Sequence, residues 1–283
     1  MNIDKLKSIA LLTCWYGPYP WYFPYFVHSC GFNSTVDFYI ITENKEEIPN
    51  KPDNVKIVCK TFDELRTDFS EKLGFTVSLD YPYKLCDFKP AYGFLFPEII
   101  AGYDFWGIGD IDVVYGDIRS FMTDEILKVY DVISSRHDYI TGSFCLFRNN
   151  EQINTLFIQS KDYKKVFSTS INFCFDECNY LFDYLTEGKS IFDFPDNIQS
   201  MTYIVKKMEF EGKLKAFFDF IIIEGTPGEI CYNRGQVIYK NMYEVMFYHL
   251  IKFKTSCRKQ TVLNPIPESY FFTPTRILPN NSK

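Results

Sequence analysis

Long apolar runs, metal-binding cysteine pairs and basic charge are all scarce in this chain of 283 residues. The apolar run nearest the N-terminus covers only residues 9–12, too few for a signal-peptide core or for a membrane span of about 20 residues. The nine cysteines include no C-x-x-C pair, so we expect no zinc site and a reducing compartment. The net charge of −6 argues against nucleic-acid binding. We therefore expect a cytoplasmic protein with at most peripheral contact at the inner face of the membrane.

Several catalytic and nucleotide-binding motifs are absent as well. The sequence contains no G-x-x-x-x-G-K-[ST], G-x-S-x-G or H-E-x-x-H segment. Gly107 and Gly109 could begin a dinucleotide-binding fingerprint, but Asp112 stands where its third glycine would be. These absences disfavour P-loop enzymes, serine hydrolases, zinc proteases and dinucleotide-dependent enzymes.

The composition that remains is that of a globular protein with many aromatic residues. Hydrophobic residues make up 46% of the chain and charged residues 23%, which is typical of folded domains. The aromatic residues are 29 Phe, 21 Tyr and 3 Trp. Most of them recur at helical or alternating spacing, so we expect them in the core and not in a sugar-binding surface.

The first part of the chain alternates strand-like and helix-like segments. Strands are expected at residues 7–14, 36–42, 55–59 and 105–109, and helices at 21–30, 62–73 and 87–100. This alternation predicts an α/β fold with a mixed, mainly parallel sheet flanked by helices. Ligands bind such sheets beyond the carboxyl ends of the strands. The segments after Thr13, Thr42 and Gly109 are therefore where we expect the chemistry.

The second part is less regular and shows no linker or internal repeat. Strands are expected at residues 131–135, 143–148, 217–224, 237–240 and 245–250, and helices at 151–160 and 177–187. We expect one domain over residues 1–260, with a nucleotide-binding half at about 1–118 and an acceptor-side half at about 119–260. Residues 261–283 are rich in Pro and Asn and are expected to form an extended C-terminal tail.

Two carboxylates two residues apart follow the apolar strand expected at 105–109. Asp110 and Asp112 lie on the same side of an extended chain because side chains alternate between its two faces. At the end of a strand they can share a divalent cation, and carboxylate oxygens suit Mg²⁺ or Mn²⁺. An exposed acidic turn is the alternative.

The segment around this pair resembles a known family. Residues 105–118, FWGIGDIDVVYGDI, and the upstream Lys89-Pro90-Ala91-Tyr92-Gly93 are similar to the D-x-D region of GT-A-fold glycosyltransferases of the bacterial polysaccharide-biosynthesis type. The resemblance implies a GT-A fold, and Mn²⁺ or Mg²⁺ on Asp110 and Asp112. It also implies a nucleotide-sugar donor, with UDP as the usual nucleotide, and transfer to a glycan or lipid-linked acceptor in surface polysaccharide assembly.

The same resemblance suggests a third metal ligand near the end of the chain. His249 lies in FYHLIKFK, residues 247–254, which is similar to a C-terminal motif in which histidine completes the metal shell and lysine contacts the diphosphate. Lys252 and Lys254 are the candidates for that contact. Imidazole is an acceptable Mn²⁺ ligand and lysine a compact phosphate partner. A hydrogen-bonded core histidine is the alternative for His249.

Further donor-binding residues are expected at three places. The resemblance places the nucleoside at the end of the first strand, beside Thr13 and Tyr16, where an aromatic ring can stack on a base. It places the ribose near Thr42 at the end of the second strand. The resemblance implies that Lys84 and Asp87, which open the helix expected before the D-x-D strand, contact the nucleotide and the sugar. The alternatives are core packing for Tyr16 and helix capping, with Asp87 as the N-cap.

The acceptor side has two candidate acids. The resemblance places Gly142 in a small-residue loop that shapes the sugar pocket, and Asp176 or Glu177 beside the acceptor hydroxyl as orienting group or base. An acid at the start of the helix expected at 177–187 would also be explained by the helix dipole. The stereochemistry stays open; the His-bearing C-terminal motif favours retention.

Two other classes of function fit the same residues. A metal-dependent nucleotide-sugar hydrolase or nucleotidyltransferase could use the same pair of aspartates. A non-catalytic sugar-binding module would keep the fold and lack metal binding.

Overall fold

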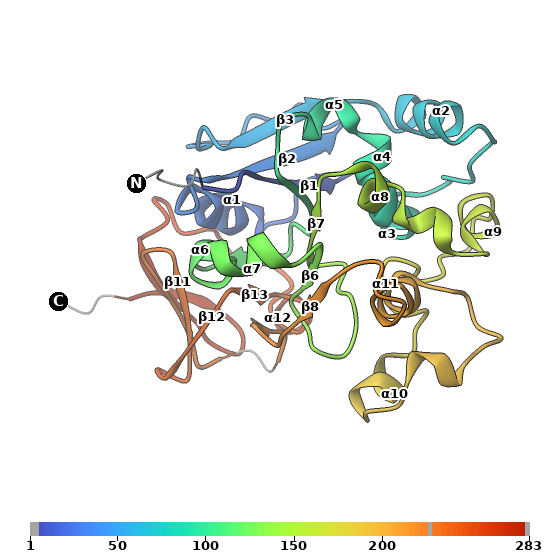
Figure 1. Cartoon of the computed structure of the whole chain (residues 1–283). Coiled ribbons are helices and arrows are strands. Elements are labelled where there is room, and N and C mark those ends of the chain that lie inside the picture. The colour runs from blue at the N-terminus through green and yellow to red at the C-terminus, as the bar shows by residue number, and fades with distance from the viewer. Residues whose placement is uncertain (1–5, 226–227, 281–283) are drawn as a thin grey trace, which may run out of the picture.

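The computed structural model describes residues 6–225 and 228–280, and its centre is a seven-stranded sheet (Figure 1). The strand order is β3-β2-β1-β4-β7-β6-β8. The bounds are Ile9–Cys14 for β1, Val36–Thr42 for β2, Val55–Cys59 for β3, Phe105–Gly109 for β4, Val132–Ser134 for β6, Phe144–Arg148 for β7 and Ala216–Phe218 for β8. Only β7 lies antiparallel to its neighbours β4 and β6, and the other pairings are parallel. The predicted mixed, mainly parallel sheet is confirmed.

Alternating side chains of the sheet supply two separate cores. In β1, Ala10 and Leu12 belong to one core and Ile9 and Leu11 to the other, because successive residues of a strand face opposite sides. One face is covered mainly by α2 (Phe62–Leu73), α3 (Leu85–Phe88), α4 (Tyr92–Leu95), α5 (Pro97–Ile100), α8 (Glu151–Asn154), α9 (Tyr163–Phe167) and α11 (Met201–Phe210). The other is covered by α1 (Phe23–Gly31), α6 (Ile118–Phe121) and α7 (Asp124–Val129). Helices therefore flank the sheet on both sides within a single domain, as predicted.

The predicted helices differ in how closely they match the structure. Residues 62–73 form α2 with the predicted bounds, because Thr61 and Glu64 make a capping box and Gly74 ends the helix at a φ of 75°. Residues 87–100 are broken into short turns instead, with Pro90 in a 3₁₀ turn and Pro97 opening α5. Proline removes a helical hydrogen bond, which explains the interruptions. Of the helix expected at 177–187, only α10 (Phe182–Thr186) is present.

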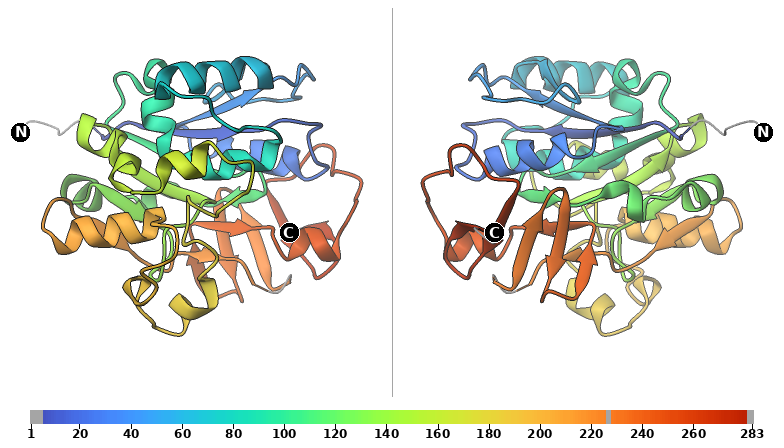
Figure 2. Two further views of the ribbon diagram at one scale, coloured as in Figure 1. Left: turned by 90° about the vertical axis from the view of Figure 1, so that its right-hand side faces the viewer. Right: turned by 90° about the vertical axis from the view of Figure 1, so that its left-hand side faces the viewer.

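Two smaller sheets complete the molecule. A three-stranded sheet has the order β5-β13-β9, with bounds Val113–Tyr115, Phe247–His249 and Ile222–Ile223. A five-stranded sheet has the order β12-β11-β10-β14-β15, with bounds Tyr243–Val245, Gln236–Tyr239, Ile230–Asn233, Ser269–Phe272 and Ile277–Pro279. In the two side views these C-terminal strands form a layer beneath the central sheet (Figure 2).

Two predictions about the second half are wrong. The expected strand at 217–224 is divided, because β8 pairs in the central sheet and β9 in the three-stranded sheet. Residues 269–279 are not an extended tail: β14 pairs with β10, and β15 pairs with β14. Tyr270, Phe272 and Ile277 are buried there, so this segment completes a core that local composition does not reveal. No described helix has both the length and the apolar character needed to span a membrane.

Candidate active site

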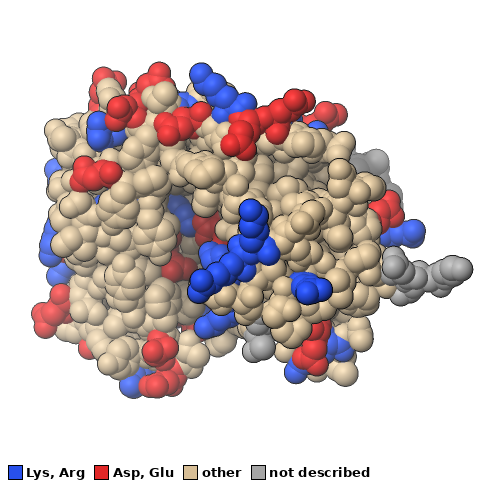
Figure 3. Space-filling model, turned by 180° about the vertical axis from the view of Figure 1, so that it is seen from behind, with Lys and Arg blue, Asp and Glu red and all other residues tan. Residues whose placement is uncertain are grey.

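A cavity of about 630 Å³ opens where β1 and β4 end. This is the edge at which mainly parallel sheets bind ligands. Its lining combines Thr13 and Cys14 from β1, Asp110 and Asp112 after β4, and His249 from β13. Seen from behind, the molecular surface is hollowed near its centre, and acidic and basic side chains lie within the hollow (Figure 3).

Asp110, Asp112 and His249 form the cluster with metal-ligand chemistry. One oxygen of each carboxylate and one ring nitrogen of His249 all lie within 4.8 Å of one another. Strand pairing produces this arrangement: β13 runs antiparallel to β5, and the Leu250 amide donates to the Asp112 carbonyl at 2.8 Å. Residues more than 130 positions apart in the chain are thereby placed side by side.

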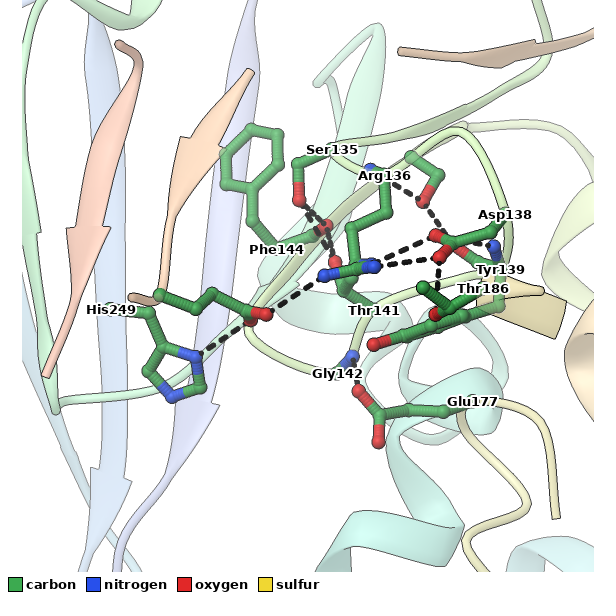
Figure 4. Close-up of polar contacts among 12 residues, drawn as sticks. Ser135, Arg136, Asp138, Tyr139, Thr141, Gly142, Phe144, Glu177, Thr186 and His249 are labelled. Atoms are coloured by element: carbon green, nitrogen blue, oxygen red, sulfur yellow. Dashed lines mark hydrogen bonds and ion pairs between the residues drawn. The ribbon is translucent and has the colours of Figure 1, made fainter. Parts of the chain in front are cut away.

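The orientation of His249 is set by a chain of charged partners. Its Nδ1 lies 3.1 Å from Glu224 Oε1, and its Nε2 lies 3.6 Å from Asp112 Oδ2. Glu224 in turn accepts from Arg136 at 3.0 Å, and Arg136 donates to both oxygens of Asp138 (Figure 4). A carboxylate behind a histidine is the usual support of a metal-binding imidazole, because it fixes the ring and the tautomer. The donor set therefore fits a divalent cation.

The same contacts change the proton affinities of the cluster. Burial acts to lower the pKa of His249, but hydrogen bonds to Asp112 and Glu224 raise it to about 10. Burial acts to raise the pKa of Asp112, but His249 and Lys254 hold this pKa well below its usual range. Asp112 is thus kept ionised, which is the state that binds metal, whereas His249 is protonated at neutral pH and has to release its proton when it binds a cation.

Two lysines add positive charge beside the aspartates. Lys89 Nζ lies 2.7 Å from Asp110 Oδ1 and 2.8 Å from the Gly142 carbonyl oxygen. Lys254, for which the family resemblance implied a diphosphate contact, forms an ion pair with Asp112 and lines the cavity. Although burial lowers it, the pKa of Lys89 is raised well above its usual range by Asp110 and its other neighbours. The Lys89 ammonium therefore stays charged at neutral pH.

The two candidate acids of the acceptor side lie in a turn that faces the same cavity. Asp176 is 3% exposed, and its Oδ2 is 3.8 Å from Lys89 Nζ. Glu177 Oε1 accepts from the Gly142 amide at 2.8 Å. Burial raises the pKa of Asp176 well above its usual range, opposed by Lys89 and reinforced by Glu177. No helix begins here, since α10 starts at Phe182, so the helix-dipole explanation of these acids is wrong.

Gly142 packs closely against both Asp176 and Lys89. A Cβ at this position would lie 2.4 Å from Asp176 Oδ2 and 3.1 Å from Lys89 Nζ. Any larger residue would have to displace one of the two. The predicted small-residue position is therefore a close approach of backbone to an ion pair.

Of the residues expected around the nucleoside, Thr13 and Tyr16 line the cavity and Thr42 is not among the described residues that do. Thr13 Oγ1 donates to the Gly109 carbonyl at 2.9 Å, which ties β1 to the start of the D-x-D segment. Tyr16 donates its hydroxyl to the Lys60 carbonyl at 3.1 Å. Thr42 is fully buried and accepts from the Asn44 amide, so its side chain stabilises the turn after β2.

Lys84 and Asp87 are placed differently from the expectation. Lys84 Nζ donates to Asp87 Oδ2, the Val166 carbonyl and the Ile171 carbonyl at 2.6–2.8 Å, which uses all three of its hydrogens. Neither residue is among the described lining of the cavity. Asp87 is no N-cap either: it lies in the first turn of α3 and accepts from the Phe173 and Phe175 amides. The pair supports the turn that carries Asp176.

Lys252 lies outside the described lining of the cavity, exposed at the N-cap of α12 (Phe253–Ser256).

Three residues of the site were not predicted from the sequence: Lys89, Glu224 and Arg136. Lys89 stood in the Lys-Pro-x-Tyr-Gly segment that carried the family resemblance, which was the available signal. Glu224 directly follows the apolar run 220–223. Arg136 had no local signal.

Fold and site together define an α/β protein with a carboxylate–histidine cluster at the carboxyl end of its central sheet. Within that class, the chain belongs to the family described as "Family of unknown function (DUF6625)", which matches residues 11–281. No curated protein matches the chain.

The solved structures to which the chain is similar include several glycosyltransferases. The galactosyltransferase LgtC in complex with donor and acceptor sugar analogs is 14% identical with a TM-score of 0.35, over 57% of this chain and 66% of that one. The apo glycosyltransferase GlyE of Streptococcus pneumoniae TIGR4 is 13% identical with a TM-score of 0.35, over 77% and 46% of the two chains. Apo mouse xyloside xylosyltransferase 1 is 10% identical with a TM-score of 0.43, over 86% and 97%. The chain thus spans just under two thirds of the first of these structures and less than half of the second.

Proposed function

We propose that this protein is a metal-dependent glycosyltransferase that moves a sugar from a nucleotide-sugar, with UDP as the nucleotide, to a glycan or lipid-linked acceptor in surface polysaccharide assembly. The observation that carries the proposal is the Asp110–Asp112–His249 cluster, which shares one cavity with Lys89 and Lys254. Carboxylates, imidazole and ammonium groups together suit a metal-bound diphosphate. We place the enzyme in the cytoplasm, with at most peripheral membrane contact.

Asp110, Asp112 and His249 would hold Mn²⁺ or Mg²⁺. Imidazole among the ligands favours Mn²⁺, because Mg²⁺ prefers oxygen donors. A bound divalent cation supplies Lewis-acid stabilisation of the charge that develops on the leaving diphosphate. Glu224 holds the His249 ring in place, and Lys254 lies where its ammonium can pair with phosphate oxygens.

The remaining residues divide between the two substrates. Thr13 and Tyr16, in the half at about 1–118, form the wall for the nucleoside. Gly142, Asp176 and Glu177, in the half at about 119–260, form the wall for the acceptor. Asp176 orients the acceptor hydroxyl or takes its proton. Burial raises the pKa of this acid, which makes its carboxylate a stronger base than that of an exposed aspartate. We favour retention of configuration, in which Asp176 orients the sugar.

Calorimetric titration of UDP with and without Mn²⁺ tests the proposal. Wild-type protein should bind UDP only with the metal, and Asp110→Ala and Asp112→Ala should each abolish the metal-dependent binding. Asp53→Ala, an exposed acid outside the lining of the cavity, should behave as wild type. Absence of UDP binding to the wild type, with GDP and CDP as further probes, would reject the metal–diphosphate site. Turnover of UDP-sugars that needs no acceptor would identify a hydrolase instead.

A further inference from the structure

Two tyrosines at the mouth of the cavity are unusually exposed for this protein. Tyr83 is 66% exposed and Tyr180 is 56% exposed. Both line the cavity, although they come from segments almost 100 residues apart. Large exposed aromatic rings at the mouth of a cavity are candidates for ligand contact, because removing their apolar surface from water on ligand binding is favourable.

Hydrogen bonds connect the two tyrosines through one amide side chain. Tyr180 donates its hydroxyl to Asn172 Oδ1 at 2.6 Å, and Asn172 Nδ2 donates to the Tyr83 carbonyl at 3.5 Å. Tyr180 also adopts a φ of 63°, a left-handed conformation that few non-glycine residues take. The ring of Tyr180 is therefore held in place while its face remains exposed.

The aromatic surface continues into the cavity. The rings of Tyr180 and Phe182 meet edge-on with centroids 6.5 Å apart, and Phe182 meets Tyr139 at 5.2 Å. Phe182 and Tyr139 also line the cavity. We call the set Tyr83, Tyr180, Phe182 and Tyr139 the aromatic wall. It leads from the solvent toward the acids Asp176 and Glu177.

The charged groups that act on the two exposed tyrosines are acids. Burial raises the pKa of Tyr83, and the nearby carboxylate of Asp176 raises it further. Burial likewise raises the pKa of Tyr180 to about 12, with Asp87 and Asp176 adding to the effect. Among the described residues that line the cavity, acids outnumber lysines: Asp110, Asp112, Asp176, Glu177 and Glu224 against Lys89 and Lys254. This excess of acids disfavours a phosphate or carboxylate ligand at the wall.

We propose that the aromatic wall is the acceptor subsite and that it binds an uncharged pyranose at the end of a glycan. The inference rests on the proposed function and narrows its acceptor to a neutral sugar. The C–H face of a pyranose packs on Tyr83 and Tyr180, and its hydroxyl edge reaches the amide of Asn172 and the carboxylates of Asp176 and Glu177. A phosphate-bearing lipid headgroup is not the group that enters this subsite.

Saturation-transfer NMR titrations with methyl pyranosides test the inference. The probes are the methyl glycosides of glucose, galactose, mannose, N-acetylglucosamine and xylose, with glucose 1-phosphate and N-acetylneuraminic acid as anionic probes. At least one neutral probe should bind the wild type more tightly than both anionic probes. Tyr83→Ala and Tyr180→Ala should each weaken that binding about tenfold, whereas Tyr83→Phe, which keeps the ring, should stay within about twofold.

Two controls separate this inference from the donor site and from loss of fold. Phe210→Ala, which removes a ring that is 89% exposed and outside the cavity lining, should bind as wild type. The affinity for UDP with Mn²⁺ should be the same in all variants, because the two tyrosines belong to the acceptor subsite. A wild-type protein that binds a neutral pyranoside but not UDP would reject the proposed function alone. The inference is overturned if no neutral pyranoside binds, if the alanine variants bind as wild type, if the anionic probes bind better, or if UDP affinity falls together with pyranoside affinity.

Discussion

At the scale of single residues, the site consists of side chains held by partners far away in the chain. His249 is fixed by Glu224, which is bound by Arg136. The acidic cluster was predicted from its spacing and its position after a strand, and the structure brings the predicted third ligand to it. Glu224 and Arg136 were not predicted, because a hydrogen bond between distant residues leaves no local pattern in the sequence.

Replacing Glu224 with Gln should weaken Mn²⁺ binding about 10- to 100-fold, since the carboxylate behind a metal-binding histidine sets its orientation and basicity. The dissociation constant for Mn²⁺ can be measured by electron paramagnetic resonance of the free ion. Glu229→Gln is the matched control, because Glu229 pairs only loosely with Lys240 at 3.9 Å on the surface. Equal Mn²⁺ affinities for the two variants would show that Glu224 does not support the site.

Replacing Asp138 with Asn should lower stability in a pH-dependent way. Burial acts to raise the pKa of Asp138, but the Arg136 guanidinium holds it below its usual range. A depressed folded-state pKa stabilises the protein above the unfolded value of about 3.9, and that stabilisation is lost as pH falls through the folded value. Urea unfolding should therefore show a cost of about 1–3 kcal/mol at pH 7 that shrinks below about pH 4. Asp53→Asn should show no such dependence, and a pH-independent cost for Asp138→Asn would argue against the mechanism.

At the scale of elements, short helices and turns are positioned by buried polar groups. Lys84 and Asp87 are fully buried and together bind two backbone carbonyls and two backbone amides around the turn before Asp176. We expected them to contact the donor, because the family resemblance places a basic residue and an acid of this segment at the nucleotide and the sugar. Burial by α9 and the 171–175 segment, which no local pattern indicates, gives them a structural role.

Replacing Asp87 with Asn should cost about 3–5 kcal/mol, because it leaves the buried Lys84 ammonium without its counter-charge. The free energy of unfolding in urea measures the cost. Glu211→Gln removes one partner of the exposed Lys213–Glu211 pair, and that variant should unfold as wild type. Equal free energies of unfolding for the two variants would mean that Lys84 loses its charge or reaches solvent when residue 87 is neutral.

At the scale of the whole molecule, the C-terminal strands β14 and β15 pack against the segment that carries His249 and Lys254. Phe272 in β14 packs edge-on against Tyr248 and Phe253, with centroids 5.0 and 5.3 Å apart. Tyr248 precedes His249 in the chain, and Phe253 precedes Lys254. The strands at 269–279 thus hold the segment that brings both site residues to Asp112.

Truncating Phe272 to Ala should lower the free energy of unfolding by about 3–5 kcal/mol, since a fully buried aromatic ring is lost and a cavity remains. Urea unfolding monitored by circular dichroism measures the change. Leu278→Ala in β15, where the side chain is 44% exposed, is the control and should cost much less. If Phe272→Ala lowered the free energy of unfolding no more than that control does, the C-terminal strands would not contribute to the stability of the domain.

The sequence by itself determined the local features: the strands at 36–42, 55–59 and 105–109, the helix at 62–73, and the acidic pair after the central strand. Each of these depends on periodicity, capping or turn residues that lie within a few positions of one another. The division of 217–224 between two sheets, the burial of Lys84 and the contacts of His249 were decided only by tertiary structure. They depend on pairing and burial between segments up to 139 residues apart, as for Asp110 and His249, and the free energy of those contacts exists only once the sheets have assembled.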